Sequence, residues 1–144
     1  MFADFLRRLT APAPDPMTDG DARLALAALL VRLARADGDY ADVEIRRIDA
    51  VLSTRFDLSP FEAAALRAEA ETLEAHAPDT VRFTRAIKEA VPHDDRLGVL
   101  TAMWSVVLAD GQRDDHEDSS MRVIANLLGI TDRDSALARK RAGG

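Results

Sequence analysis

The stretch Ala36-Asp37-Gly38-Asp39-Tyr40-Ala41-Asp42-Val43-Glu44 returns later in the chain as Ala109-Asp110-Gly111-Gln112-Arg113-Asp114-Asp115-His116-Glu117. Both copies begin with Ala-Asp-Gly, end in Glu, and carry an Asp two residues before that Glu. A constant offset of 73 residues relates these matching positions, which composition alone would not produce. The stretch therefore indicates a tandem of two similar units, each with an acidic corner between two helices.

The match extends to both sides of this motif. Apolar residues pair at the same offset in the preceding segment, as at Leu30 and Met103, and in the following one, as at Ile48 and Met121. One residue is then dropped, after which residues 58–59 correspond to residues 130–131. We therefore expect two pseudo-repeats, at about 19–75 and 92–142.

Composition limits the class of protein. The 144 residues are 47% hydrophobic, which suits one domain with a real core. The absence of cysteine excludes a disulfide, a thiolate nucleophile and Cys-ligated zinc in this chain. The net charge of −6 argues against a nucleic acid as the main partner. No apolar run reaches the roughly 20 residues of a membrane-spanning helix, so we expect no transmembrane segment.

Apolar residues recur at helical spacing throughout, and no convincing strand pattern is present, so the sequence predicts an all-α fold. We expect a single-domain bundle of about seven helices over residues 19–142. The predicted helices are 19–36, 42–56, 60–75 after a Ser59 cap, 78–91, 92–110, 114–128 and 132–141. Residues 1–9 are predicted to form a short amphipathic helix, and residues 10–18 a Pro-rich linker.

Each corner gathers carboxylates that are candidate metal ligands. These are Asp37, Asp39, Asp42 and Glu44 in the first unit, and Asp110, Asp114, Asp115 and Glu117 in the second. A hard divalent cation such as Ca²⁺, Mg²⁺ or Mn²⁺ binds several converging oxygen ligands of this kind. The spacing is not that of an EF-hand, whose loop has its Gly at the sixth position and its Glu at the twelfth.

Helix capping is the alternative explanation of these acids. Asp114 and Glu117 have capping-box spacing, and the helix dipole favours acids at a helix start. In the first unit the capping position holds Ala41, so capping explains Glu44 less well. Both explanations stay open, and the first corner is the better candidate for a cation site.

Known catalytic motifs are absent from the sequence. There is no phosphate loop, dinucleotide fingerprint or nucleophile elbow, and the three His residues are not at metal-ligand spacing. We therefore expect a protein that is not an enzyme. The predicted N-terminal helix carries Arg7 and Arg8 on its polar side, which makes it a candidate for contact with a membrane or a partner.

The two Ala-Asp-Gly motifs with Glu44 and Glu117, in an all-helical chain, resemble the tellurite-resistance TerB family. The same fold is similar to the N-terminal domain of a membrane-anchored DnaJ-like co-chaperone. The resemblance covers about residues 19–141 and implies a seven-helix bundle built from two halves. It further implies a cytoplasmic bacterial protein, peripheral to the inner membrane, that serves in tellurite and general stress resistance. Divalent metal bound through the acids and membrane-associated protein partners are implied as well.

Three functions follow as hypotheses. The leading one is a non-enzymatic, metal-binding stress-response module that acts through protein partners. The second is a helical adaptor or co-chaperone-like interaction domain in which the acids only cap helices. The third is a metal-dependent hydrolase. A rise in melting temperature on adding Ca²⁺, Mg²⁺ or Mn²⁺ would separate the first from the second.

Overall fold

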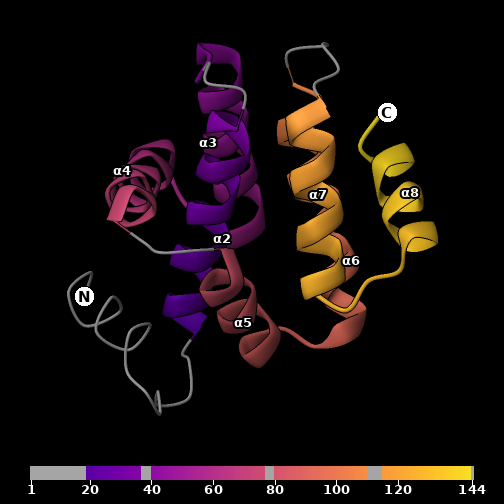
Figure 1. The fold of residues 1–144 in the computed structure, drawn as a ribbon. Helices are drawn as coiled ribbons and strands as arrows, with labels where there is room; N and C mark the ends of the chain where they lie inside the picture. The colour runs from indigo at the N-terminus through magenta and orange to yellow at the C-terminus, as the bar shows by residue number, and fades with distance from the viewer. Residues whose placement is uncertain (1–18, 37–39, 77–79, 110–114, 144) are drawn as a thin grey trace.

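The computed structural model describes residues 19–36, 40–76, 80–109 and 115–143, with the backbone alone described for 19–21 and 115–117. Within these ranges the chain forms seven helices and no strand, which confirms the predicted all-α fold (Figure 1). The helices are α2 (Asp19–Arg35), α3 (Asp42–Phe56), α4 (Pro60–His76), α5 (Thr80–Ala90), α6 (His93–Val107), α7 (Asp115–Leu127) and α8 (Asp132–Arg141). The predicted N-terminal helix at 1–9 and the linker at 10–18 lie outside the described residues.

Helix α2 is the centre of the bundle. Every residue from Leu24 to Val31 is buried, so this helix has no solvent-facing side over two turns. It packs against α3, α4, α5 and α6. In Figure 1, α4 lies on one side of this centre and α8 on the opposite edge. The result is one continuous core that draws on every helix of the described part.

Local sequence explains where the helices begin. The Glu62 N–H donates to Ser59 Oγ at 3.1 Å, and the Ser59 N–H donates to Glu62 Oε1 at 3.0 Å, which completes a capping box for α4. These bonds hold the pKa of Glu62 below its usual range. At the start of α8, Thr131 Oγ1 accepts from the Asp134 N–H at 3.2 Å.

Helices α3 and α7 end in the same way. The residue after the last turn is left-handed in each case, Asp57 with φ 54° and Gly129 with φ 74°. The next N–H then reaches back to a carbonyl of the last turn, from Leu58 to Ser53 at 3.0 Å and from Ile130 to Ala125 at 2.8 Å. A left-handed backbone costs a non-glycine residue conformational energy, so Asp57 is the more strained of the two stops.

The order of elements follows the register of the predicted repeat. Helices α2, α3 and α4 correspond to α6, α7 and α8 in sequence, and the matched residues Leu30 and Met103 are both buried. Helices α3 and α7 both begin at the end of the bundle drawn at the top of Figure 1. Superposition of the two halves stays a prediction.

The described residues also bear on membrane insertion. None of the helices that the structure describes combines the length and apolar character needed to cross a bilayer.

A candidate cation site at the start of helix α3

Glu44 occupies the first turn of α3, at the corner that follows α2. Helix α3 begins after Ala41, whose backbone is extended at φ −72° and ψ 149°. Glu44 Oε1 accepts from the Ala41 N–H at 3.4 Å, and the Glu44 N–H donates to the Ala41 carbonyl at 3.0 Å. Because alanine has no side-chain acceptor, this is only the glutamate half of a capping box. Glu44 therefore has a capping role, although Ala41 at the cap position made capping the weaker explanation in the sequence analysis.

Glu44 is fully buried, at 0% exposure. The other buried polar side chains of the described residues, Thr84 and Ser135, are neutral hydroxyls. A carboxylate is rarely buried completely, and where it is, it is paired or coordinates a metal. The N-terminal dipole of α3 favours a negative charge at this position.

Asp42 does not share the position of Glu44. Residues two positions apart on a helix are separated by about 200° around its axis, so the side chains of Asp42 and Glu44 point to different sides. In agreement with this, Asp42 is exposed whereas Glu44 is buried. That Asp42 and Glu44 bind one cation together stays a prediction.

The other predicted ligands lie beyond what the structure describes. Asp37, Asp39, Asp110 and Asp114 are outside the described residues, and Asp115 and Glu117 belong to the backbone-only first turn of α7. In the described ranges no three His, Asp or Glu side chains form a group suited to a metal ion. Among the predicted ligands whose side chains the structure describes, Glu44 offers buried carboxylate oxygens, which are ligands of the kind that a hard cation binds.

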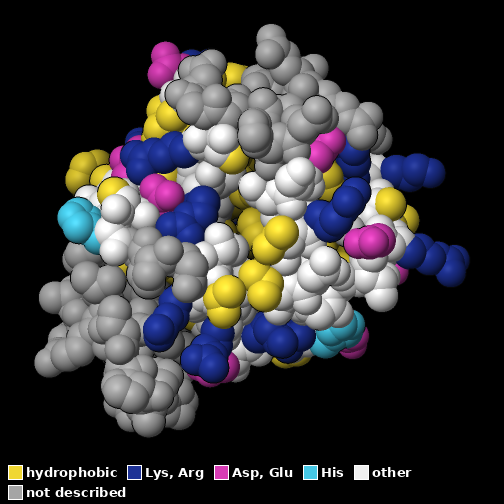
Figure 2. Space-filling model, viewed as in Figure 1, with side chains coloured by type: hydrophobic (Ala, Val, Ile, Leu, Met, Phe, Trp, Pro, Cys, Tyr) yellow, Lys and Arg dark blue, Asp and Glu magenta, His cyan; other side chains and the backbone are white. Residues whose placement is uncertain are grey.

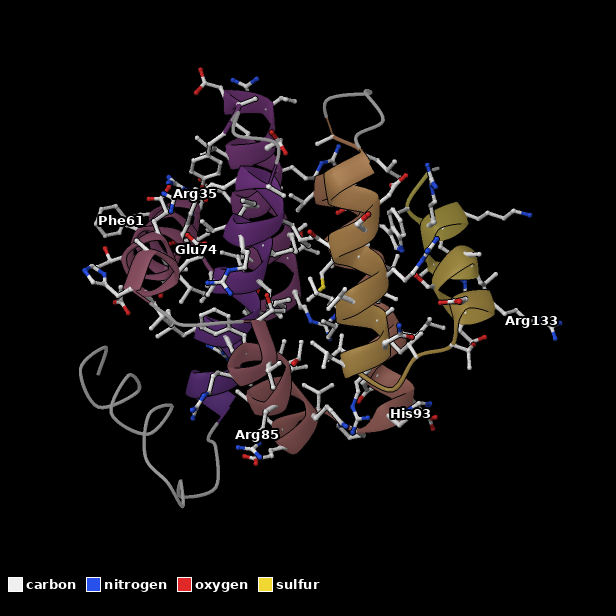
Figure 3. The ribbon with its side chains drawn as sticks, viewed as in Figure 1. Arg35, Phe61, Glu74, Arg85, His93 and Arg133 are labelled. Carbon is white, nitrogen blue, oxygen red and sulfur yellow. The ribbon has the colours of Figure 1, made fainter. Side chains whose placement is uncertain are left out.

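Beside this corner the structure places a network that the sequence analysis missed. Tyr40, just before α3, lies under the guanidinium of Arg35, 5.0 Å from the ring centroid. Arg35 Nη1 contacts Glu74 Oε2 at 2.8 Å, and Arg32 Nε contacts Glu74 Oε1 at 3.2 Å. Arg35 and Glu74 are labelled in Figure 3. The end of α2 is thereby tied to α4 next to the candidate site.

A second set of ion pairs continues the network to α3. Arg67 Nε contacts Asp49 Oδ1 at 2.6 Å, and Arg67 Nη1 contacts Glu71 Oε2 at 3.2 Å. The Tyr40 hydroxyl is buried near Glu71 without hydrogen-bonding geometry to it. Burial first, and the negative Glu71 second, raise the pKa of Tyr40 well above its usual range. Tyr40 therefore stays protonated at pH values at which an ordinary tyrosine ionises.

Another surface feature lies away from the corner. In Figure 2, hydrophobic side chains gather near the middle of the visible face, with Lys and Arg side chains below them. Val81 on α5 and Val123 on α7 are each about half exposed. A hollow of about 320 Å³ is lined by residues of α5 and by Leu127 of α7. It contains no cluster of acids, so it is not an extension of the candidate cation site.

Comparison with known proteins identifies one family. The family model described as tellurite resistance protein TerB matches residues 23–140 of this chain. The match begins within α2 and ends within α8. No curated protein and no solved structure shows significant similarity to the chain.

Proposed function

Because the chain belongs to the family of tellurite resistance protein TerB, we propose that it is a non-enzymatic stress-response module of the tellurite-resistance type. In this proposal the module binds a divalent cation at the α3 corner and acts through protein partners. The single observation that carries the cation part is the complete burial of the Glu44 carboxylate in the first turn of α3.

The proposed ligands come from both corners. Glu44 supplies the buried oxygens of the first site, and Asp37 and Asp39 are its proposed companions. Asp110, Asp114, Asp115 and Glu117 form the proposed second site. Asp42 is exposed on another side of α3, so we give it a role in attracting the ion to the surface. The cation would supply charge compensation at the corner. With no cysteine in the chain, direct reduction of tellurite by a thiol of this protein is excluded.

We place the module in the cytoplasm of a bacterium, beside membrane-associated partners. This placement rests on the family alone. The alternative is a helical adaptor or co-chaperone-like domain in which the acids only cap helices. The hydrogen bond from the Ala41 N–H to Glu44 Oε1 favours this alternative, because it gives Glu44 a structural role without a metal.

Metal-linked stability tests the proposal. Adding Ca²⁺, Mg²⁺ or Mn²⁺ should raise the free energy of unfolding of the wild-type chain by about 1.4 kcal/mol when the ion is at ten times its dissociation constant. Replacing Glu44 by Gln should remove most of this gain, because the amide keeps the shape but loses the charge. The measurement is thermal unfolding with and without each ion.

Glu62 offers a matched control for this experiment. It also stands at the third position of a helix and also accepts from the N–H of its cap residue, but its carboxylate is exposed. Glu62→Gln should therefore leave the metal-dependent gain unchanged. If no ion at millimolar concentration stabilises the wild-type chain, or if both variants lose the gain equally, the adaptor alternative replaces the cation proposal.

A further inference from the structure

A groove runs between α3, α6 and the end of α8. It has a volume of about 730 Å³. One side of α3, from Arg47 to Phe56, and one side of α6, from Gly98 to Ser105, form its walls, together with Arg141 and Ala142 at the end of α8. The core face of α3, which includes Ile48 and Leu52, points elsewhere.

The spacing of the lining residues suits the binding of another helix. On α3 the lining positions 47, 50, 51, 54 and 55 follow helical spacing, and on α6 the positions 98, 101, 102 and 105 do the same. Each helix thus offers one stripe of exposed or half-buried side chains to the groove. From Arg47 to Arg55 the stripe is about 12 Å long, which is slightly more than two turns.

The floor of the groove permits close approach. Its α6 side consists of Gly98, Thr101, Ala102 and Ser105, all small side chains. A Cβ at Gly98 would meet only Arg55 Nη1, at 3.5 Å, so nothing but a guanidinium covers this backbone. Small residues let two helix backbones come together, and an open channel of this kind suits a polypeptide better than a compact ligand that needs enclosure.

The charge of the groove is opposite to that of the chain. The protein carries a net charge of −6, yet three arginines, Arg47, Arg55 and Arg141, line this one channel. Among the described residues, none of these three guanidinium groups forms an ion pair, whereas Arg32, Arg35 and Arg67 on the other side of the bundle all do. Burial lowers the pKa of Arg55, and the negative Asp95 partly offsets this.

We propose that this groove binds an amphipathic helix of a partner protein, with an apolar stripe toward α6 and Asp or Glu residues toward the arginines. The inference rests on the proposed action through protein partners and names the chemistry of the partner segment.

The structure also indicates the direction in which the partner helix lies in the groove. At Arg55 and Gly98 the groove meets a second hollow, of about 380 Å³, that is lined by Asp94 and Asp95. The acidic end of the partner helix therefore lies toward Arg47 and Arg141.

The probe for this proposal is a synthetic, fluorescein-labelled helical peptide with a Leu and Ala stripe flanked by Glu. A second peptide with Lys in place of every Glu is its control. Fluorescence anisotropy should show that the protein binds the acidic peptide and does not bind the Lys peptide. The double variant Arg47→Glu with Arg141→Glu should weaken this binding about tenfold or more, the equivalent of about 1.4 kcal/mol.

Matched variants separate the groove from general charge. Arg46→Glu with Arg133→Glu makes the same change in net charge on the same two helices, at exposed positions that do not line the groove; Figure 3 shows Arg133 pointing away from the bundle. This control should weaken binding much less. Ala102→Phe should block the groove without a charge, whereas Ala65→Phe on the exposed side of α4 should not. Circular dichroism establishes that each variant is folded.

Each outcome decides the proposal. Equal weakening by both charge-reversal pairs, unchanged binding to the Ala102→Phe variant, or no binding of the acidic peptide at all would overturn it. If the protein binds no peptide but sediments with phosphatidylglycerol vesicles in a way that depends on Arg47, the occupant of the groove is a lipid surface and not a partner helix. Repeating the peptide titration with Glu44→Gln separates this proposal from the cation site. Unchanged binding to that variant means that the groove stands whatever becomes of the metal.

Discussion

Phe83→Ala should lower the free energy of unfolding by about 3–5 kcal/mol, the usual cost of removing a buried aromatic side chain. Phe83 is fully buried on α5, and the guanidinium of Arg32 lies 5.3 Å from its ring centroid. Helix α5 packs mainly on α2, so the cavity would open beside the central helix. Urea denaturation followed by circular dichroism measures the loss.

Phe61 gives the control for this substitution. It is 84% exposed at the start of α4, and its side chain points outward in Figure 3. Phe61→Ala should change the free energy of unfolding by no more than about 0.5 kcal/mol. A loss below about 1 kcal/mol for Phe83→Ala, or equal losses for the two variants, would contradict the described core.

Glu74→Ala should cost about 2–3 kcal/mol. Glu74 holds both Arg32 and Arg35, and its side chain is only 14% exposed. Removing one partner of a buried ion pair costs about 3–5 kcal/mol because the remaining charges stay desolvated, and partial exposure of the arginines reduces this figure. Thermal unfolding at low and at high salt measures the effect.

The exposed Glu69 on the same helix is the matched control for Glu74. Glu69→Ala should leave stability within about 0.5 kcal/mol of the wild type. If Glu74→Ala behaves in the same way, the network between α2 and α4 does not stabilise the corner.

Helix positions were predictable because their signals are local. The predicted starts of α4 and α8 agree with the structure, because Ser59 and Thr131 cap these two helices. The predicted bounds of α3 agree as well, because apolar spacing marks its buried side. The predicted ends of α6 and α7 differ from the observed ends by a few residues at most. Fraying of terminal turns accounts for differences of this size.

The surroundings of the candidate site were less predictable, because they depend on contacts between distant residues. The ion pair of Arg35 with Glu74 joins residues 39 positions apart, and no periodic pattern in the sequence predicts it. The burial of Glu44 depends on how the corner packs. Ala41 at the cap position made capping a weaker explanation of Glu44, but the backbone N–H of Ala41 donates a hydrogen bond to its carboxylate. The pair of Arg67 and Glu71 has the local i, i+4 spacing of a helix, but the sequence analysis did not predict it.

The central claim is that a divalent cation binds at Glu44, and Mn²⁺ titration followed by NMR tests it most directly. A bound paramagnetic ion broadens the amide signals of the residues nearest to it. We predict early broadening of the Tyr40, Ala41 and Glu44 signals, well before those of Glu62 and Asp134, whose carboxylates are exposed at other helix starts. Glu44→Gln should abolish this preference. Broadening that is uniform over the exposed acids, or that persists unchanged in the Glu44→Gln variant, would contradict the account.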